Sequence, residues 1–137
     1  MRAGPDEADV WLARAAVVYE SGNGKMAAVN LTKAHEREPG ATTARRCAEL
    51  ALDMGDLKEA DRWLRKAQAG APDSALVALR LGVYFDRAGD LEQARHHLNR
   101  ALQLEPRLKM ARLALDDVNS RGPFSTVVRA WRKWSRS

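Results

Sequence analysis

Small and apolar residues recur along this chain at a nearly constant spacing. When the sequence is shifted by 33 and then by 34 residues, the same residue types fall on the same positions. The five matched columns are Gly22, Gly55 and Gly89; Ala27, Ala60 and Ala94; Leu31, Leu64 and Leu98; Ala34, Ala67 and Ala101; and Pro39, Pro72 and Pro106. Five columns in one register indicate an internal repeat.

Each repeat carries the signals of two helices joined by a turn. Every glycine of the first column ends a helical pattern and is followed at once by Asn or Asp, which suits a left-handed helix end and then an N-cap acceptor. The prolines close the units, because a residue that precedes Pro is steered out of the helical region. We expect small residues to let the two helices approach closely, namely Ala15, Ala48 and Gly82 facing Ala27, Ala60 and Ala94.

This period, with its mid-repeat glycine, spaced alanines and terminal proline, resembles the tetratricopeptide repeat family. The third copy fits the family pattern best, through Leu81-Gly82, Phe85, Gly89-Asp90, Ala94, Leu98, Ala101 and Leu104-Glu105-Pro106. The first copy departs from the pattern at Asn23-Gly24, where the others carry Asp56-Leu57 and Asp90-Leu91.

The resemblance implies an all-α solenoid, because one helix pair of this kind cannot bury its apolar face alone. We expect an N-terminal lead (1–7), three helix-turn-helix repeats (8–40, 41–74 and 75–108), a capping helix (109–120) and a basic amphipathic C-terminal helix (121–137). With 137 residues, the chain has no room for a separate substrate domain. The first repeat starts with almost no cap before it, as in a piece cut from a longer protein.

In the family that the chain resembles, partners lie in a concave groove lined by the first helix of each repeat. Projecting the register places ten expected partner contacts on this groove, which are Leu12, Tyr19, Arg46, Glu49, Leu52, Leu76, Leu79, Arg80, Val83 and Arg87. The same projection also places Asp9, Ala16, Glu20, Thr42, Arg45, Asp53 and Asp86 on the groove. Met110 and Leu113 fall at the capping end. The apolar members give this face more apolar area than a solvated helix surface needs. The alternative is that several of them are packed between adjacent helices.

One subclass of the family clamps the C-terminal carboxylate of chaperones with Lys, Asn and Arg side chains. The matching positions here are Leu12, Ala16, Arg46, Leu76 and Arg80, and only Arg80 agrees in type. The resemblance therefore argues against a chaperone tail as the partner. Arg46 and Arg80 are placed to hold an acidic group of some other partner.

The C-terminal tail has its own pattern after Pro123. Phe124, Val127, Val128, Trp131 and Trp134 fall on one helical face, and Arg129, Arg132, Lys133 and Arg136 fall on the other. We expect Phe124, Val128, Trp131 and Trp134 to make the tail's contacts. The tail could dock into its own groove or that of a second copy, lie on an anionic membrane, or extend the solenoid by one packed helix. Nucleic acid is disfavoured, because the basic patch is small and isolated.

The charge balance and the reactive side chains limit the classes of function that the chain can have. The chain has 23 Lys and Arg against 18 Asp and Glu, and without Arg121 and the four basic tail residues the two totals are equal. The single cysteine, Cys47, lies on an apolar stripe, which predicts a buried core residue in a reducing compartment. His96 and His97 are neighbours on one helix, so they cannot face one metal ion. We find no catalytic motif, metal spacing or cofactor motif, and expect no enzyme activity and no cofactor.

These observations predict a protein-interaction scaffold or adaptor, without catalysis, that binds a partner peptide or helix in the concave groove. The alternative is a peripheral membrane-associated or self-assembling factor that is recruited through its basic tail. No apolar run approaches the length of a membrane span, and residues 1–9 lack the apolar segment of a secretory signal. We expect a cytoplasmic protein that is peripheral at a membrane if the alternative holds.

Overall fold

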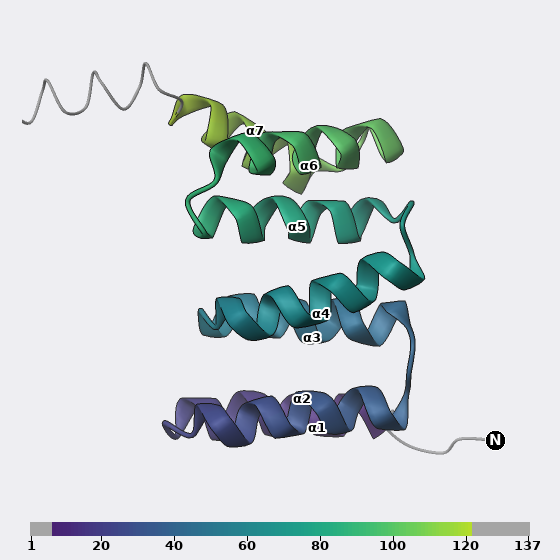
Figure 1. Cartoon of the computed structure of the whole chain (residues 1–137), viewed down its shortest axis with the longest axis vertical. Coiled ribbons are helices and arrows are strands. Elements are labelled where there is room, and N and C mark those ends of the chain that lie inside the picture. The colour runs from purple at the N-terminus through teal and green to yellow at the C-terminus, as the bar shows by residue number, and fades with distance from the viewer. Residues whose placement is uncertain (1–6, 122–137) are drawn as a thin grey trace, which may run out of the picture.

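The computed structural model of the protein describes residues 7–121. These residues form seven helices, α1 (Glu7–Glu20), α2 (Gly24–Arg37), α3 (Ala41–Met54), α4 (Leu57–Gly70), α5 (Ala75–Arg87), α6 (Leu91–Leu104) and α7 (Lys109–Ser120). Every element in the described part of the chain is helical, so the prediction of an all-α solenoid is confirmed. Figure 1 shows the helices stacked in chain order along the long axis of the molecule.

The turns within the helix pairs follow from the glycine column. Gly22, Gly55 and Gly89 have φ angles of 89°, 77° and 88°, in the left-handed region that glycine enters without steric cost. The next residue in each case is the N-cap of the following helix. Asn23, Asp56 and Asp90 each accept a hydrogen bond from the backbone N–H three residues on, at 3.0, 3.1 and 3.1 Å. The departure at Asn23 in the first repeat therefore leaves the turn unchanged.

The connections between helix pairs follow from the proline column. Helices α2, α4 and α6 end at Arg37, Gly70 and Leu104, two residues before Pro39, Pro72 and Pro106. The intervening residue leaves the helical region, as expected before a proline. Each connection then turns the chain so that the next first helix packs on the previous pair.

The small residues lie where the two helices of a pair meet. Ala15 and Ala27, and Ala48 and Ala60, are buried with at most 1% of their surface exposed. In the third pair, an added Cβ at Gly82 would lie 2.6 Å from Cγ of Leu98 and 3.4 Å from the backbone oxygen of Ala94. The predicted close approach within each pair is therefore present.

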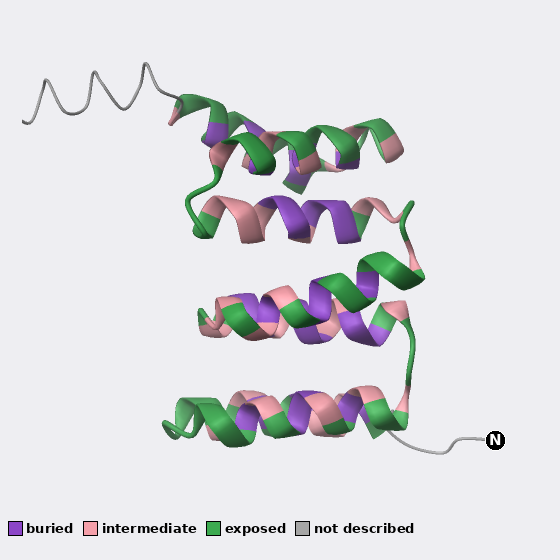
Figure 2. Ribbon diagram, in the orientation of Figure 1, coloured by how far each residue is buried: buried purple, intermediate pink, exposed green. Residues whose placement is uncertain are grey.

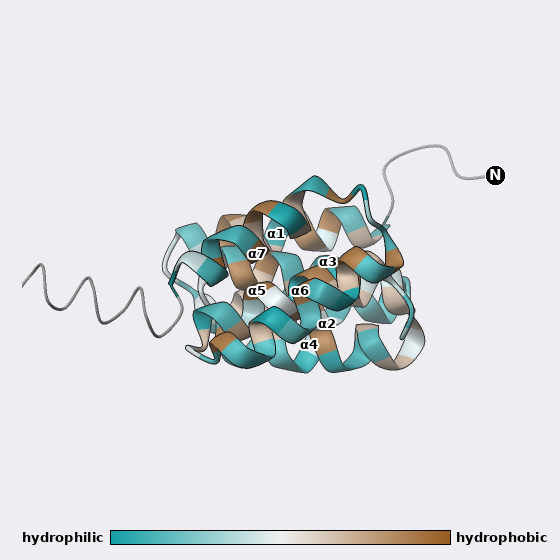
Figure 3. Ribbon diagram, turned by 90° about the horizontal axis from the view of Figure 1, so that it is seen from above, coloured by the Kyte–Doolittle hydropathy of each residue, from teal (hydrophilic) through white to brown (hydrophobic). Residues whose placement is uncertain are grey.

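The buried side chains form a core that runs through the stack between the helices. Figure 2 shows buried segments on every helix of the stack, and Figure 3, viewed from above, places α1 and α3 toward one side and α2 and α4 toward the other. Cys47 of α3 has no exposed surface, its Sγ lies 3.5 Å from the carbonyl oxygen of Leu31, and burial raises its pKa to about 12. The prediction of a buried core cysteine is confirmed.

Two half-buried histidines are expected to make the stability of the stack depend on pH. Burial lowers the pKa of both His35 and His97 from the ordinary value of 6.5. The positive charges of Lys66 and Arg62 lower the pKa of His35 further, and His96 lowers the pKa of His97 further. For His35 the packing also uses the neutral form, because its Nε2 accepts a hydrogen bond from the backbone N–H of Gly40 at 3.3 Å.

We expect the free energy of unfolding to fall as the pH is lowered from about 7.5 to about 5.5. The folded-state pKa values lie below the unfolded value, so the unfolded chain binds more protons in this range. The stabilisation is complete above the ordinary pKa of about 6.5 and is lost as the pH falls below it. Urea unfolding followed by circular dichroism at several pH values measures the slope. The His35→Gln, His97→Gln double variant should show a flatter slope, and an equal slope in both proteins would contradict this assignment.

Candidate binding groove

The face formed by α1, α3, α5 and α7, here called the first-helix face, is crossed by a series of ion pairs. Each pair joins a carboxylate of one first helix to an arginine of the next. Asp9 of α1 pairs with Arg46 of α3, Glu49 of α3 pairs with Arg80 of α5 at 2.7 Å, and Asp86 of α5 pairs with Arg121, just after α7, at 2.8 Å. Successive first helices are thereby connected by polar contacts as well as by the core.

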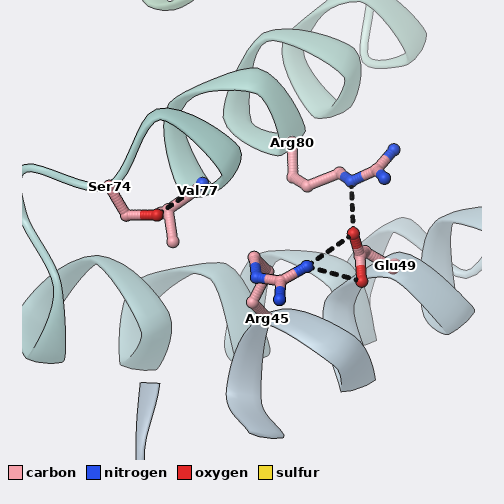
Figure 4. Close-up of polar contacts among 5 residues, drawn as sticks. All are labelled: Arg45, Glu49, Ser74, Val77 and Arg80. Atoms are coloured by element: carbon pink, nitrogen blue, oxygen red, sulfur yellow. Dashed lines mark hydrogen bonds and ion pairs between the residues drawn. The ribbon is translucent and has the colours of Figure 1, made fainter. Parts of the chain in front are cut away.

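Glu49 is the centre of this series (Figure 4). Nη1 of Arg45 donates to both of its carboxylate oxygens at 3.0 Å, one helical turn away on α3, and Nε of Arg80 donates to Oε2 from α5. Ser74 caps α5 and accepts a hydrogen bond from the backbone N–H of Val77 at 3.3 Å, which fixes the start of the helix that carries Arg80. The half-buried carboxylate thus holds two guanidinium groups on the middle of the first-helix face.

Backbone carbonyls at the ends of the helices add two further contacts. The hydroxyl of Tyr19 on α1 donates to the carbonyl oxygen of Met54, and Nη1 of Arg87 on α5 donates to the carbonyl oxygen of Leu52. Both acceptors lie in the last turn of α3, where carbonyls have no partner within the helix. Ion pairs with this exposure each contribute about 0–1 kcal/mol, so they add little to the packing that determines the spacing of the helices.

An open hollow of about 530 Å³ lies on this face between α1 and α3. Its charged lining consists of three carboxylates and one guanidinium, from Asp9, Glu49, Asp53 and Arg46. Leu12, Ala13 and Leu50 form the rest of its wall. The hollow is acidic overall, and Asp53 is the exposed carboxylate at its edge.

Three of the predicted groove residues belong to the core. Leu12, Leu52 and Leu79 are 8%, 2% and 1% exposed. They pack between neighbouring helices, as the alternative interpretation of the apolar positions held, so they have almost no surface for a partner to contact. Their prediction as partner-binding residues is therefore corrected.

The other predicted groove residues keep accessible surface. Leu76 and Tyr19 are each 39% exposed, Arg87 is exposed, and Val83 is half-buried. Met110 and Leu113, predicted at the capping end, are exposed on α7. Whether a partner contacts these residues stays a prediction.

The arginines predicted to hold an acidic group of a partner are engaged within the protein. Arg46 pairs with Asp9, and Arg80 pairs with Glu49. A ligand carboxylate would have to displace these partners. Sequence reasoning placed Asp53 on the groove but missed the ion pairing, although each ion pair has a carboxylate and an arginine about one repeat apart, between 31 and 37 residues.

The contacts predicted for the C-terminal tail, through Phe124, Val128, Trp131 and Trp134, lie outside the described residues. Self-association through the tail and recruitment to an anionic membrane stay predictions. Among residues 7–121, no helix is long and apolar enough to span a bilayer. The same residues contain no group of three or more His, Cys, Asp or Glu side chains that could hold a metal ion.

Known proteins resemble this chain in sequence pattern and in fold. Residues 18–81 match the family model described as tetratricopeptide repeat. The first such domain of Spaghetti (RPAP3), bound to the HSP90 peptide SRMEEVD, superposes with a TM-score of 0.67 at 19% identity, over 88% of this chain and 97% of that chain. No curated protein matches the sequence.

Two further solved structures have the same fold. The tetratricopeptide repeat domain of Arabidopsis OM64 superposes with a TM-score of 0.64 at 21% identity, over 81% of this chain and 93% of that chain. MamA (41-end) from Desulfovibrio magneticus RS-1 gives a TM-score of 0.68 at 19% identity, over 91% of this chain and 71% of that chain. At these identities the likeness concerns the fold alone.

Proposed function

Because the chain belongs to the tetratricopeptide repeat family, whose domains are protein-interaction modules, we propose that it binds a partner peptide or helix along the first-helix face and performs no catalysis. The observation that carries the proposal is the hollow between α1 and α3, whose lining includes the ion-paired Asp9 and Arg46. A hollow that is already formed between packed helices needs little reordering when a partner binds, which favours affinity.

The charges of the hollow indicate the kind of peptide. Glu49 is already engaged by Arg45 and Arg80, so Asp53 is the carboxylate best placed to meet a ligand. A lysine or arginine of the partner would pair with Asp53 at the edge of the hollow. Leu76 and Tyr19 offer partly exposed apolar surface elsewhere on the same face.

The neighbouring structure that holds an HSP90 peptide does not extend that ligand to this chain. SRMEEVD carries two glutamates and an aspartate, and it would meet the acidic hollow. Of the positions that would clamp its carboxylate, Leu12 is buried and Arg46 and Arg80 are paired with carboxylates. We therefore propose a partner with basic rather than acidic side chains at this face.

We expect peptides that are selected from a random display library for binding to the full chain to carry Lys or Arg. These peptides should bind the Asp53→Lys variant at least about tenfold more weakly than the wild type, because the substitution reverses the charge that they meet. Fluorescence anisotropy of the labelled peptides measures the affinity. Glu92→Lys, the same change of charge at an exposed position of α6, is the matched control and should bind normally. Equal affinity for the wild type and Asp53→Lys would place the binding site elsewhere.

A further inference from the structure

The side of α1 that faces away from the other helix pairs has the residue positions that pack against a neighbouring helix in the later units. The register aligns Val10 and Arg14 of α1 with buried residues on the later first helices, which are Thr43 and Cys47 of α3 and Val77 and Leu81 of α5. Cys47, for example, contacts the backbone of Leu31 on α2. In the later units this side of the first helix is covered by the preceding helix pair, whereas on α1 it is uncovered in the described structure.

The neighbouring side of α2 is apolar only in the first unit. Met26 and Val29 are 44% and 45% exposed. The aligned residues of the later units are polar, namely Glu59 and Arg62 on α4 and Gln93 and His96 on α6. Surface positions that are polar in the second and third units but apolar in the first indicate that a partner covers this surface in the first unit.

These two sides meet in one groove of about 580 Å³ between α1 and α2. Val10, Trp11, Val17, Val18 and Met26 supply its apolar wall, and Val17 is 63% exposed. The volume is in the range of ligand-binding clefts, about 300–1,000 Å³. The groove and the acidic hollow share Ala13 of α1, but the groove continues onto α2 and the hollow onto α3, so their other lining residues differ.

The charge of this groove is positive. Arg14 is the one charged side chain among the described residues that line it. The guanidinium of Arg14 lies 4.7 Å and the ammonium of Lys33 lies 5.4 Å from the centre of the Trp11 ring, so the indole holds two cations at the edge of the apolar surface. Glu7, at the N-terminal end of the groove, pairs with Arg37 at 3.8 Å and leaves the excess positive charge with Arg14 and Lys33.

We propose that the groove between α1 and α2 is a second binding surface, which takes an amphipathic helix of a partner protein with acidic flanks. The apolar side chains of that helix, spaced at i, i+3, i+4 and i+7, pack on Val17 and Met26. Its carboxylates face Arg14 and Lys33. The chain's own C-terminal segment, or that of a second copy, is a poorer occupant, because Arg129, Arg132, Lys133 and Arg136 would bring four more cations to a basic rim.

Two capped synthetic peptides of about 18 residues, long enough for about five helical turns, provide the test. Both carry leucines at i, i+3, i+4 and i+7, and the remaining positions hold Glu and Gln in one peptide and Lys and Gln in the other. We expect the acidic peptide to bind the full chain at least about tenfold more tightly than the basic one. Val17→Glu and Met26→Glu should each abolish this binding, and Arg14→Glu should reverse the preference between the peptides.

Leu113→Glu is the matched control, because Leu113 is an equally exposed apolar residue on α7, 68% accessible, and should leave binding unchanged. Thermal unfolding by circular dichroism checks that each variant is folded. Equal binding of the two peptides, binding of neither, or full binding by Val17→Glu would overturn the proposal. Self-association of the full chain that is abolished by Val17→Glu would also overturn it, since the occupant would then be a second copy.

Discussion

Replacing Gly82 by valine is expected to destabilise the protein by about 3 kcal/mol or more, a large part of the total of about 5–15 kcal/mol that holds a domain together. An added Cβ at this position would lie 2.6 Å from both Cγ and Cδ2 of Leu98, and Leu98 is only 1% exposed, so it cannot swing away into solvent. The branched side chain of valine adds two methyl groups to the same contact. Urea unfolding followed by circular dichroism measures the loss.

A matched substitution separates crowding from any general effect of valine in a helix. Gly24, at the start of α2, has nothing within 4 Å of its added Cβ, so Gly24→Val should shift the urea midpoint little. In addition, Leu98→Ala and Gly82→Ala should be less destabilising together than the sum of the single changes, because the first provides space for the second. Unfolding of Gly82→Val at the wild-type midpoint would show that α5 and α6 separate at little cost.

The turns and helix boundaries could be predicted from the sequence because their causes are local. A glycine that must adopt a positive φ, such as Gly55, and an N-cap such as Asp56 act within a few residues of themselves. They do not depend on how the units pack. The same holds for Pro72, which ends α4 through its effect on the preceding residues.

For the candidate site, the sequence could predict which side chains project toward the first-helix face, but not which of them are exposed. The register shows that Leu52 and Leu79 project toward the first-helix face, but whether they are covered depends on how close the next first helix lies. That distance is set by the alanines and Gly82 within the pairs and by packing between units, which the column pattern does not report. Buried Leu52 and exposed Leu76 therefore look equivalent in the sequence and differ in the structure.

The ion pairs across the first-helix face were beyond prediction for a different reason. Asp9–Arg46 and Asp86–Arg121 join residues in successive units, and every unit offers several carboxylates and arginines for such contacts. The choice depends on side-chain rotamers and on the small rotation between units. Under the proposed function this pairing leaves Asp53 rather than Arg46 as the residue best placed to meet a partner.

Trp63 of α4 packs on His35 of the first helix pair, and its replacement by alanine is expected to destabilise the protein by about 3–5 kcal/mol. Among residues 7–121 it is the largest side chain that is fully buried, 1% exposed, and it lies in the core shared by α1 to α5. Its ring lies 5.2 Å from the imidazole of His35, centre to centre, and the guanidinium of Arg62 lies 4.6 Å from its centre. The alanine variant loses the area of the indole and gains a cavity that the packed helices cannot close.

The Trp63→Phe variant tests which part of the indole provides this stability. Nε1 of Trp63 is buried and has no hydrogen-bond partner among the described residues, and an unsatisfied buried donor costs about 1–3 kcal/mol. Phenylalanine removes that donor and keeps a ring for His35 to pack on, so we expect less than half the loss that Trp63→Ala produces. Equal losses in urea unfolding would mean that the shape of the whole indole, rather than its buried apolar area, determines how the second pair fits between its neighbours.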